Sequence, residues 1–228
     1  MLARWLLNNG FPEFTRGSVI PWLDTKEVII RMYRFAIVML VSILLTGCAA
    51  MGVPVTNDPR EKIGWALNLY EKQNRPIPAE RLLKEALDIY QSNNDELGLA
   101  ETYRQYAFFL ESVTIEKWES HYRINGFMDK SVIYDARYEK AVEYFQKARD
   151  IYSKKAKYDL LTNIDLVTGN TYLTYIGDQN KACKYYDRSL ADYQEFNKEN
   201  PTVQIKLPAE FNSYAEYIAA VKKRAKCI

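Results

Sequence analysis

A spacing of small and bulky side chains that occurs three times constrains the fold more than any other feature of the sequence. It lies within "AERLLKEALDIYQ", "EKAVEYFQKARDIYS" and "NKACKYYDRSLADYQ". In each stretch four positions follow one another at helical intervals, so they share one face of an α-helix. Small residues in the set allow a neighbouring helix to approach closely, and a bulky side chain between them fills the gap. The sets are Ala79/Leu83/Ala86/Tyr90, Ala141/Phe145/Ala148/Tyr152 and Ala182/Tyr186/Ser189/Tyr193.

This pattern resembles the second helix of the tetratricopeptide repeat, which carries A-x3-F-x2-A. Looser helical patterns precede each of the three stretches, and the resemblance covers about residues 59–197. It implies an all-α fold, a right-handed α-solenoid of about three helical hairpins, as in bacterial lipoproteins that contain such repeats. The alternative is an array of helical hairpins that is unrelated to this family.

The amino-acid composition also favours a helical fold. The 228 residues include 18 Tyr but only 9 Gly and 8 Pro, so helix-breaking residues are few. The formal net charge is +2, so no global electrostatic field favours nucleic acid or an anionic membrane. We therefore expect no nucleic-acid partner.

The predicted helical domain spans residues 59–228. Within it, the spacing between repeats predicts an insertion at about 113–136. The last apolar face predicts a C-terminal capping helix, with Pro208 in its first turn and basic residues in its last turns. A terminal helix with a polar outer face is what a stack of repeats requires.

The N-terminal part carries the pattern of an export signal. After Met32 and the basic Arg34, an apolar run from Phe35 to Leu45 is interrupted only by Ser42 and ends in "LTGC". The run is too short to span a bilayer. It resembles a bacterial lipobox, which implies a lipoprotein signal peptide at 32–47 and a Cys48 that carries acyl chains such as palmitate. The alternative is a cytoplasmic protein with a short buried segment at 35–45.

The flanking residues complete this hypothesis. Residues 1–31 lack both a helical period and a basic-then-apolar order, so we expect an untranslated or disordered upstream segment. Residues 48–58 contain Gly, Pro and Asn and are predicted to be a lipidated tether. In lipoproteins of this type, Asp after the cysteine favours the inner membrane. Ala49 therefore implies an outer-membrane protein that is anchored by its N-terminal lipid and faces the periplasm.

The remaining cysteines, Cys183 and Cys227, are predicted to form a disulfide, because the periplasm is oxidising. If the last two helices form an antiparallel hairpin with a turn near 198–207, the two cysteines lie at the same height. The alternative is one buried and one exposed free thiol.

Two surfaces are candidates for binding a protein or peptide partner in the periplasm. The first is a concave face lined by the first helix of each hairpin. The second is the insertion, whose aromatic residues could instead pack on the neighbouring repeat. The concave candidates are Asn68, Glu71, Glu101, Arg104, Phe108, Glu111, Thr171, Thr174 and Tyr175, and the insertion candidates are Trp118, Tyr122 and Phe127.

No catalytic motif occurs in the sequence, and His121 is the only histidine. We therefore expect a non-enzymatic scaffold without cofactor or metal, an adaptor or assembly factor of an envelope complex. The opposing hypothesis is an envelope enzyme, such as a cell-wall hydrolase, on a helical-repeat scaffold, which would need two buried carboxylates with raised pKa in the groove. A third is a purely structural subunit recognised by its outer face.

Overall fold

The computed structural model describes residues 52, 53, 55–203 and 205–227. All of them belong to one compact unit, Gly52–Ile228. The predicted upstream segment at 1–31, the predicted signal peptide at 32–47, Cys48 and the first residues of the predicted tether lie outside the described residues. The predicted all-α fold is confirmed, since the described part of the chain contains helices and no β-strand.

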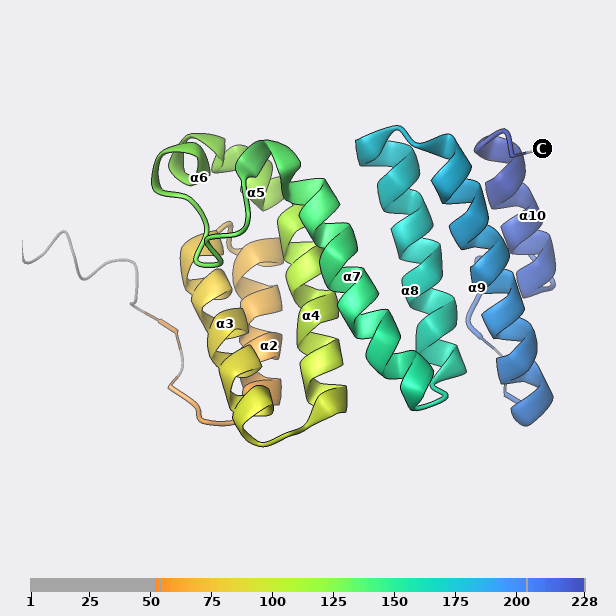
Figure 1. Cartoon of the computed structure of the whole chain (residues 1–228), viewed down its shortest axis with the longest axis horizontal. Helices are drawn as coiled ribbons and strands as arrows, with labels where there is room; N and C mark the ends of the chain where they lie inside the picture. Colours follow the sequence, from red (N-terminus) through yellow and green to blue (C-terminus); the bar gives the residue numbers. More distant parts are fainter. Residues whose placement is uncertain (1–51, 54, 204, 228) are drawn as a thin grey trace, which may run out of the picture. The chain divides into compact units, whose positions relative to one another are not determined.

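The first four long helices alternate in direction along the stack (Figure 1). The α2 helix (Pro59–Leu67) continues as a π-helical turn, η2 (Asn68–Lys72), and α3 (Pro76–Ser92) runs back beside it. Then α4 (Glu96–Glu111) is followed, after an intervening segment, by α7 (Arg137–Lys154).

The last helices continue the same alternation. The α8 helix (Tyr158–Thr171) ends in a second π-helical turn, η4 (Tyr172–Ile176), and Gly177 adopts the left-handed conformation at its end. After it come α9 (Gln179–Glu199) and α10 (Tyr214–Arg224). Each long helix packs on the next one in the chain.

The segment predicted as an insertion, 113–136, lies between α4 and α7. It forms α5 (Val113–Lys117), α6 (Glu119–Asn125), a loop and the short η3 helix (Tyr134–Ala136). Glu80 of α3 holds this loop in place. Its buried carboxylate accepts hydrogen bonds from the Tyr106 hydroxyl of α4 (2.6 Å) and from the Met128 backbone N–H of the loop (2.7 Å). Burial raises the pKa of Glu80, and these hydrogen bonds oppose the rise.

The repeated sequence pattern forms the core. Ten of its twelve side chains are buried, and only Tyr90 and Tyr193 are partly exposed. Buried apolar side chains gather in two clusters, a larger one from Ile63 to Ile164 and a smaller one from Ala182 to Ala225.

Polar contacts lie between the two clusters. Asp165 of α8 is fully buried, and both its oxygens accept from Arg149 Nε, at 2.8 and 3.1 Å. Ser189 donates to the Thr162 carbonyl (2.7 Å) and shares a hydrogen bond with the Tyr214 hydroxyl (2.6 Å). We call these contacts the polar seam.

The predicted start of the capping helix was wrong. Residues 205–208 have no helical structure, and α10 begins only at Tyr214. The Ser213 hydroxyl accepts from Glu216 N (3.1 Å), while the Glu216 carboxylate accepts from Asn212 N (3.0 Å). This capping arrangement sets the helix start, whereas Pro208 lies in the preceding connection.

Candidate functional site

The candidate site is built around an ion pair on α4. Arg104 donates to both carboxylate oxygens of Glu101, at 2.8 and 3.0 Å, and it also donates to the Asn163 side chain of α8 at 3.3 Å. Tyr152 of α7 donates to Glu101 at 3.3 Å. Burial alone would raise the pKa of Glu101, but the hydrogen bonds and charge of Arg104 outweigh it and lower that pKa. The pair is therefore a fixed charged bridge between α4 and α8.

A hollow of about 640 Å³ adjoins this bridge on the side of α2. Its lining mixes apolar and charged side chains, and Leu97 is 39% exposed in it. Glu101 belongs both to this hollow and to the bridge. The lining residues are Arg60, Ile63, Gly64, Leu67, Tyr90, Asp95, Leu97, Gly98 and Glu101.

A second hollow, of about 280 Å³, lies on the other side of the bridge, between α8, residues 205–208 and α10. Asn163 lines it, so hydrogen bonds from Arg104 link Glu101 of the first hollow to Asn163 of the second. We call this arrangement, from α2 across α4 to α8, the bridge groove. The second hollow is lined by Asp159, Thr162, Asn163, Leu166, Ile205, Lys206, Leu207, Pro208, Tyr214 and Tyr217.

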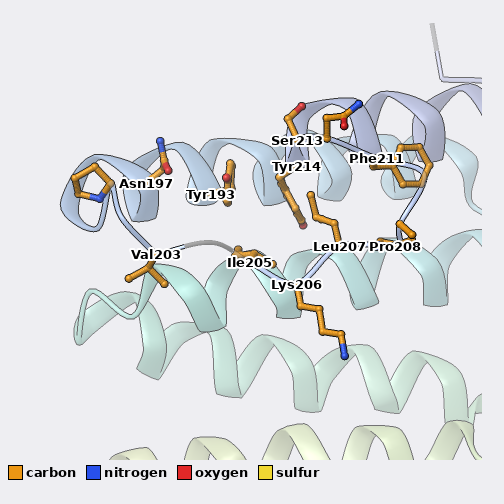
Figure 2. A pocket seen from close by; sticks show the side chains of 13 residues that line it. Tyr193, Asn197, Val203, Ile205, Lys206, Leu207, Pro208, Phe211, Ser213 and Tyr214 are labelled. Atoms are coloured by element: carbon orange, nitrogen blue, oxygen red, sulfur yellow. The ribbon is translucent and has the colours of Figure 1, made fainter.

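A third hollow, of about 560 Å³, opens on the α9 side of the same connecting segment. Figure 2 shows Tyr193 of α9 and Tyr214 of α10 above the segment, and Leu207 pointing toward Tyr214. Residues 205–208 thus have open space on both sides.

A separate polar cluster lies where α4 ends and η4 begins. The Thr171 hydroxyl donates to Glu111, which has no ion-pair partner among the described residues. Burial raises the pKa of Glu111 to about 7, and the hydrogen bond from Thr171 opposes this rise. Nearby, the Tyr175 ring stacks on Tyr138 with 4.3 Å between centroids.

The structure therefore separates the predicted concave-face residues. Glu101 and Arg104 form the centre of the bridge groove, and Phe108 packs edge-on against Phe145 beside Arg104. Four other candidates lie outside the hollows described above: Asn68 and Glu71 in η2, and Thr174 and Tyr175 in η4. Glu111 also lies outside them, in the polar cluster.

Three predicted partner-binding residues need correction. Thr171, Tyr122 and Phe127 are only 1–2% exposed and are not available to a partner. Tyr122 stacks on Phe127 (4.3 Å) and both belong to the larger core, as the packing alternative for the insertion expected. Trp118 is partly buried against the same core.

Sequence reasoning missed Asn163 and the segment at 205–208. No sequence pattern marks Asn163 as a site residue, because its role depends on the distance between α4 and α8. The segment does carry such a pattern, since Val203, Ile205 and Leu207 alternate with polar residues, which is typical of an extended chain.

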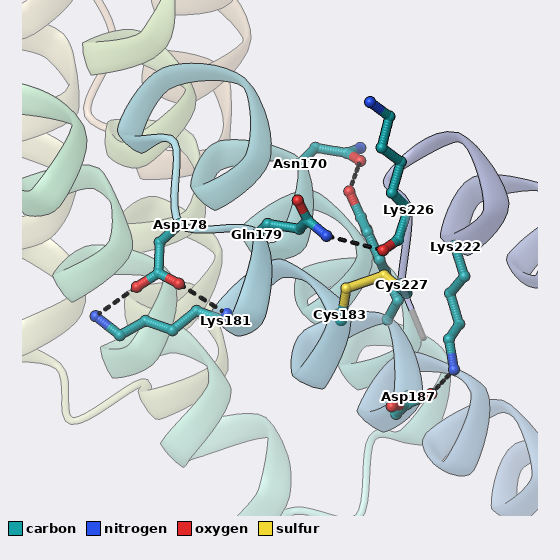
Figure 3. Close-up of a disulfide and its surroundings, with 10 residues drawn as sticks. Asn170, Asp178, Gln179, Lys181, Cys183, Asp187, Lys222, Lys226 and Cys227 are labelled. Atoms are coloured by element: carbon teal, nitrogen blue, oxygen red, sulfur yellow. Dashed lines mark hydrogen bonds and ion pairs between the residues drawn. A yellow bond between two sulfur atoms is a disulfide. The ribbon is translucent and has the colours of Figure 1, made fainter.

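The two cysteines lie at disulfide-bonding distance, as predicted. Their Cα atoms are 5.6 Å apart, and the link joins the first turns of α9 to the residues after α10 (Figure 3). Around it, Gln179 donates to the Lys226 carbonyl (2.8 Å) and Lys222 pairs with Asp187. The end of α10 is therefore held to the start of α9 by three contacts.

Comparison with known proteins identifies no relative. No protein-family model, no curated protein and no solved structure matches this chain. In the described part of the chain, no group of three or more His, Cys, Asp or Glu side chains is arranged to hold a metal ion. None of the described helices is long and apolar enough to cross a bilayer.

Proposed function

We propose that this chain is an outer-membrane lipoprotein that faces the periplasm and binds a protein or peptide partner. Its lipid is attached at Cys48, residues 48–58 form the tether, and the helices form a right-handed solenoid similar to tetratricopeptide repeats. It acts as an adaptor or assembly factor of an envelope complex and catalyses no reaction. The "LTGC" sequence after a basic residue and an apolar run supports the anchor.

The contacts between non-consecutive helices support a repeat arrangement. Side chains of α4 and α8 meet through Arg104 and Asn163, and α2 also packs on α4. On α7 and α9, Arg149 reaches Asp192 (3.4 Å) and Tyr185 donates to Gln146 (3.4 Å). The first helices α2, α4 and α8 therefore neighbour one another in order, and so do the second helices α7 and α9, as in stacked hairpins.

The bridge groove is the observation that carries the binding function. It combines two hollows of about 640 and 280 Å³ with a charged bridge whose geometry is already fixed. A preorganised polar group between partly apolar hollows recognises a partner without a large ordering cost. Such a lining suits a peptide or a segment of a protein.

The carboxylates on this face favour binding over hydrolysis. A cell-wall hydrolase needs two carboxyl groups, with the acid held at raised pKa. Glu101 is paired with Arg104 and has a lowered pKa, whereas Glu111 has a raised pKa and accepts only from Thr171. The two groups lie ten residues apart on α4, roughly 15 Å along the helix axis. The carboxyl groups of a glycosidase lie only about 5–9.5 Å apart, so Glu101 and Glu111 do not form such a pair.

In-cell photocrosslinking tests the function. A photoreactive amino acid at Leu97 or Leu166 in the bridge groove should give the same discrete adduct, and Glu143, exposed on α7, serves as the control position. A Cys48→Ala variant should lose the acyl label and the membrane association. Adducts that are equally strong from Glu143, or their absence at both groove positions, would contradict the proposal.

A further inference from the structure

Residues 205–208 form an extended segment in a unit whose described residues are otherwise mostly helical. Figure 2 shows Lys206 pointing away from α9 while the next residue, Leu207, points toward Tyr214. Side chains on opposite faces are the geometry of a β-strand. Val203 is 49% exposed, which is high for an apolar side chain.

The backbone of this segment has no partner within the described residues. Val203 N donates to the Asn200 carbonyl (3.0 Å), but Ile205, Lys206 and Leu207 make no hydrogen bond to any other described residue. An extended backbone with free N–H and C=O groups is a template for a second strand. The helices around it offer no such edge, because their backbone groups are bonded internally.

The space and charge around the segment indicate what such a strand would carry. Open hollows of about 560 and 280 Å³ flank it. Polar groups, including those of Asn197, Asn212 and Ser213, line the larger one together with the rings of Tyr193, Phe211 and Tyr214. Lys206 is the only charged residue in that lining, and it forms no ion pair with any described residue.

We propose that the segment at 205–207 binds an extended peptide of the partner by strand addition. This rests on the proposed function and specifies the form of the partner. The peptide pairs with the free backbone groups of Ile205 and Leu207, which face the same edge of the extended segment. It places alternate side chains in the larger hollow and presents an acidic side chain to Lys206. Main-chain hydrogen bonds supply affinity, and the hollow and Lys206 supply specificity.

A helical partner would gain nothing from the free backbone, because its own backbone groups are already bonded. A single lysine is also too little charge to hold an anionic membrane surface, which attracts clusters of basic residues. The charge and the free edge together therefore favour an acidic, extended peptide.

Synthetic peptides test the inference with the purified full-length protein. The probe is a fluorescent nonapeptide of alternating Val and Thr with one central Glu, compared with a copy N-methylated at alternate backbone positions. Anisotropy should show binding of the first peptide and at least tenfold weaker binding of the second. Amide exchange at Ile205 and Leu207 should slow when the first peptide is bound.

A charge swap supplies the matched control. Lys206→Glu should weaken binding of the Glu peptide about fivefold and strengthen binding of a peptide that carries Lys in place of Glu. Lys223→Glu, at an exposed position on α10, should change neither affinity. No binding of the Glu peptide, or binding indifferent to N-methylation and to the charge swap, would overturn strand addition. In that event adducts from Leu97 and Leu166 would still uphold the proposed function, and their absence would reject it separately.

Discussion

Glu111 is a carboxylate in an unfavourable place, since it is largely removed from water and accepts only the Thr171 hydroxyl. Its pKa rises to about 7 from an ordinary value near 4.5. Above the ordinary value the unfolded chain releases this proton while the folded protein retains it. The folded state is therefore penalised progressively as the pH rises from about 4.5 to about 7, and the full penalty applies above that.

Glu111→Gln removes this penalty and keeps an acceptor for Thr171. We expect the variant to equal the wild type in stability at pH 4.5 and to exceed it at pH 7.5, by at most about 3 kcal/mol. Urea unfolding at several pH values measures the difference. The matched control is Glu199→Gln at the exposed end of α9, which should change stability little at any pH. A variant that is less stable than the wild type at pH 7.5 would show that the charged form is favoured in the fold.

At the scale of elements, Gly169 sets the distance between α8 and α9. A Cβ at this position would lie 2.6 Å from the Tyr186 ring and 3.2 Å from the Ala182 carbonyl oxygen. Tyr186 is fully buried and donates to Asn170 (3.0 Å), so the ring has no free space to move into. The absent side chain is therefore a requirement of packing between these two helices.

Gly169→Ala should destabilise the protein by about 1–3 kcal/mol, even though alanine is the better helix former. Thermal unfolding measures the loss. The control is Gly64→Ala in α2, where no atom lies within 4 Å of the added methyl, and which should be neutral or stabilising. Equal effects at the two positions would mean that α8 and α9 are not held this close.

The same elements show what the sequence can predict. The spacing of Ala182, Tyr186 and Ser189 identified a buried face, because periodicity reports which side of a helix meets its neighbours. The sequence-based prediction placed the start of α10 near Pro208, because proline favours the first turn of a helix. The S-x-x-E pattern at Ser213 and Glu216 is also present in the sequence, and it marks the observed start. The pairing of Arg104 with Asn163 and the π-helical turns could not be predicted, because they depend on how two helices distant in sequence come together.

At the scale of the whole unit, two apolar clusters meet at the polar seam. Asp165 lies in it with Arg149, and Arg188 approaches the same carboxylate at 3.5 Å. Burial raises the pKa of Asp192 to about 6, and so does its hydrogen bond with Asp165. Apolar burial supplies most of the stability within each cluster, whereas buried charges offset their attraction by losing hydration. The polar contacts of the seam therefore contribute less stability than the apolar burial within each cluster.

The smaller cluster consequently depends on the link between Cys183 and Cys227. It closes a loop with a sequence separation of 44, which stabilises by about 2–4 kcal/mol if the bond is formed. Under native conditions, reductant should speed amide exchange in α10 about 30- to 1,000-fold and leave α3 and α4 unchanged. Cys227→Ser should reproduce the reduced pattern without reductant, and mass spectrometry of alkylated protein should find neither thiol free before reduction. If reduction accelerated exchange equally in α4 and α10, the unit would unfold as one body and the seam would not divide it.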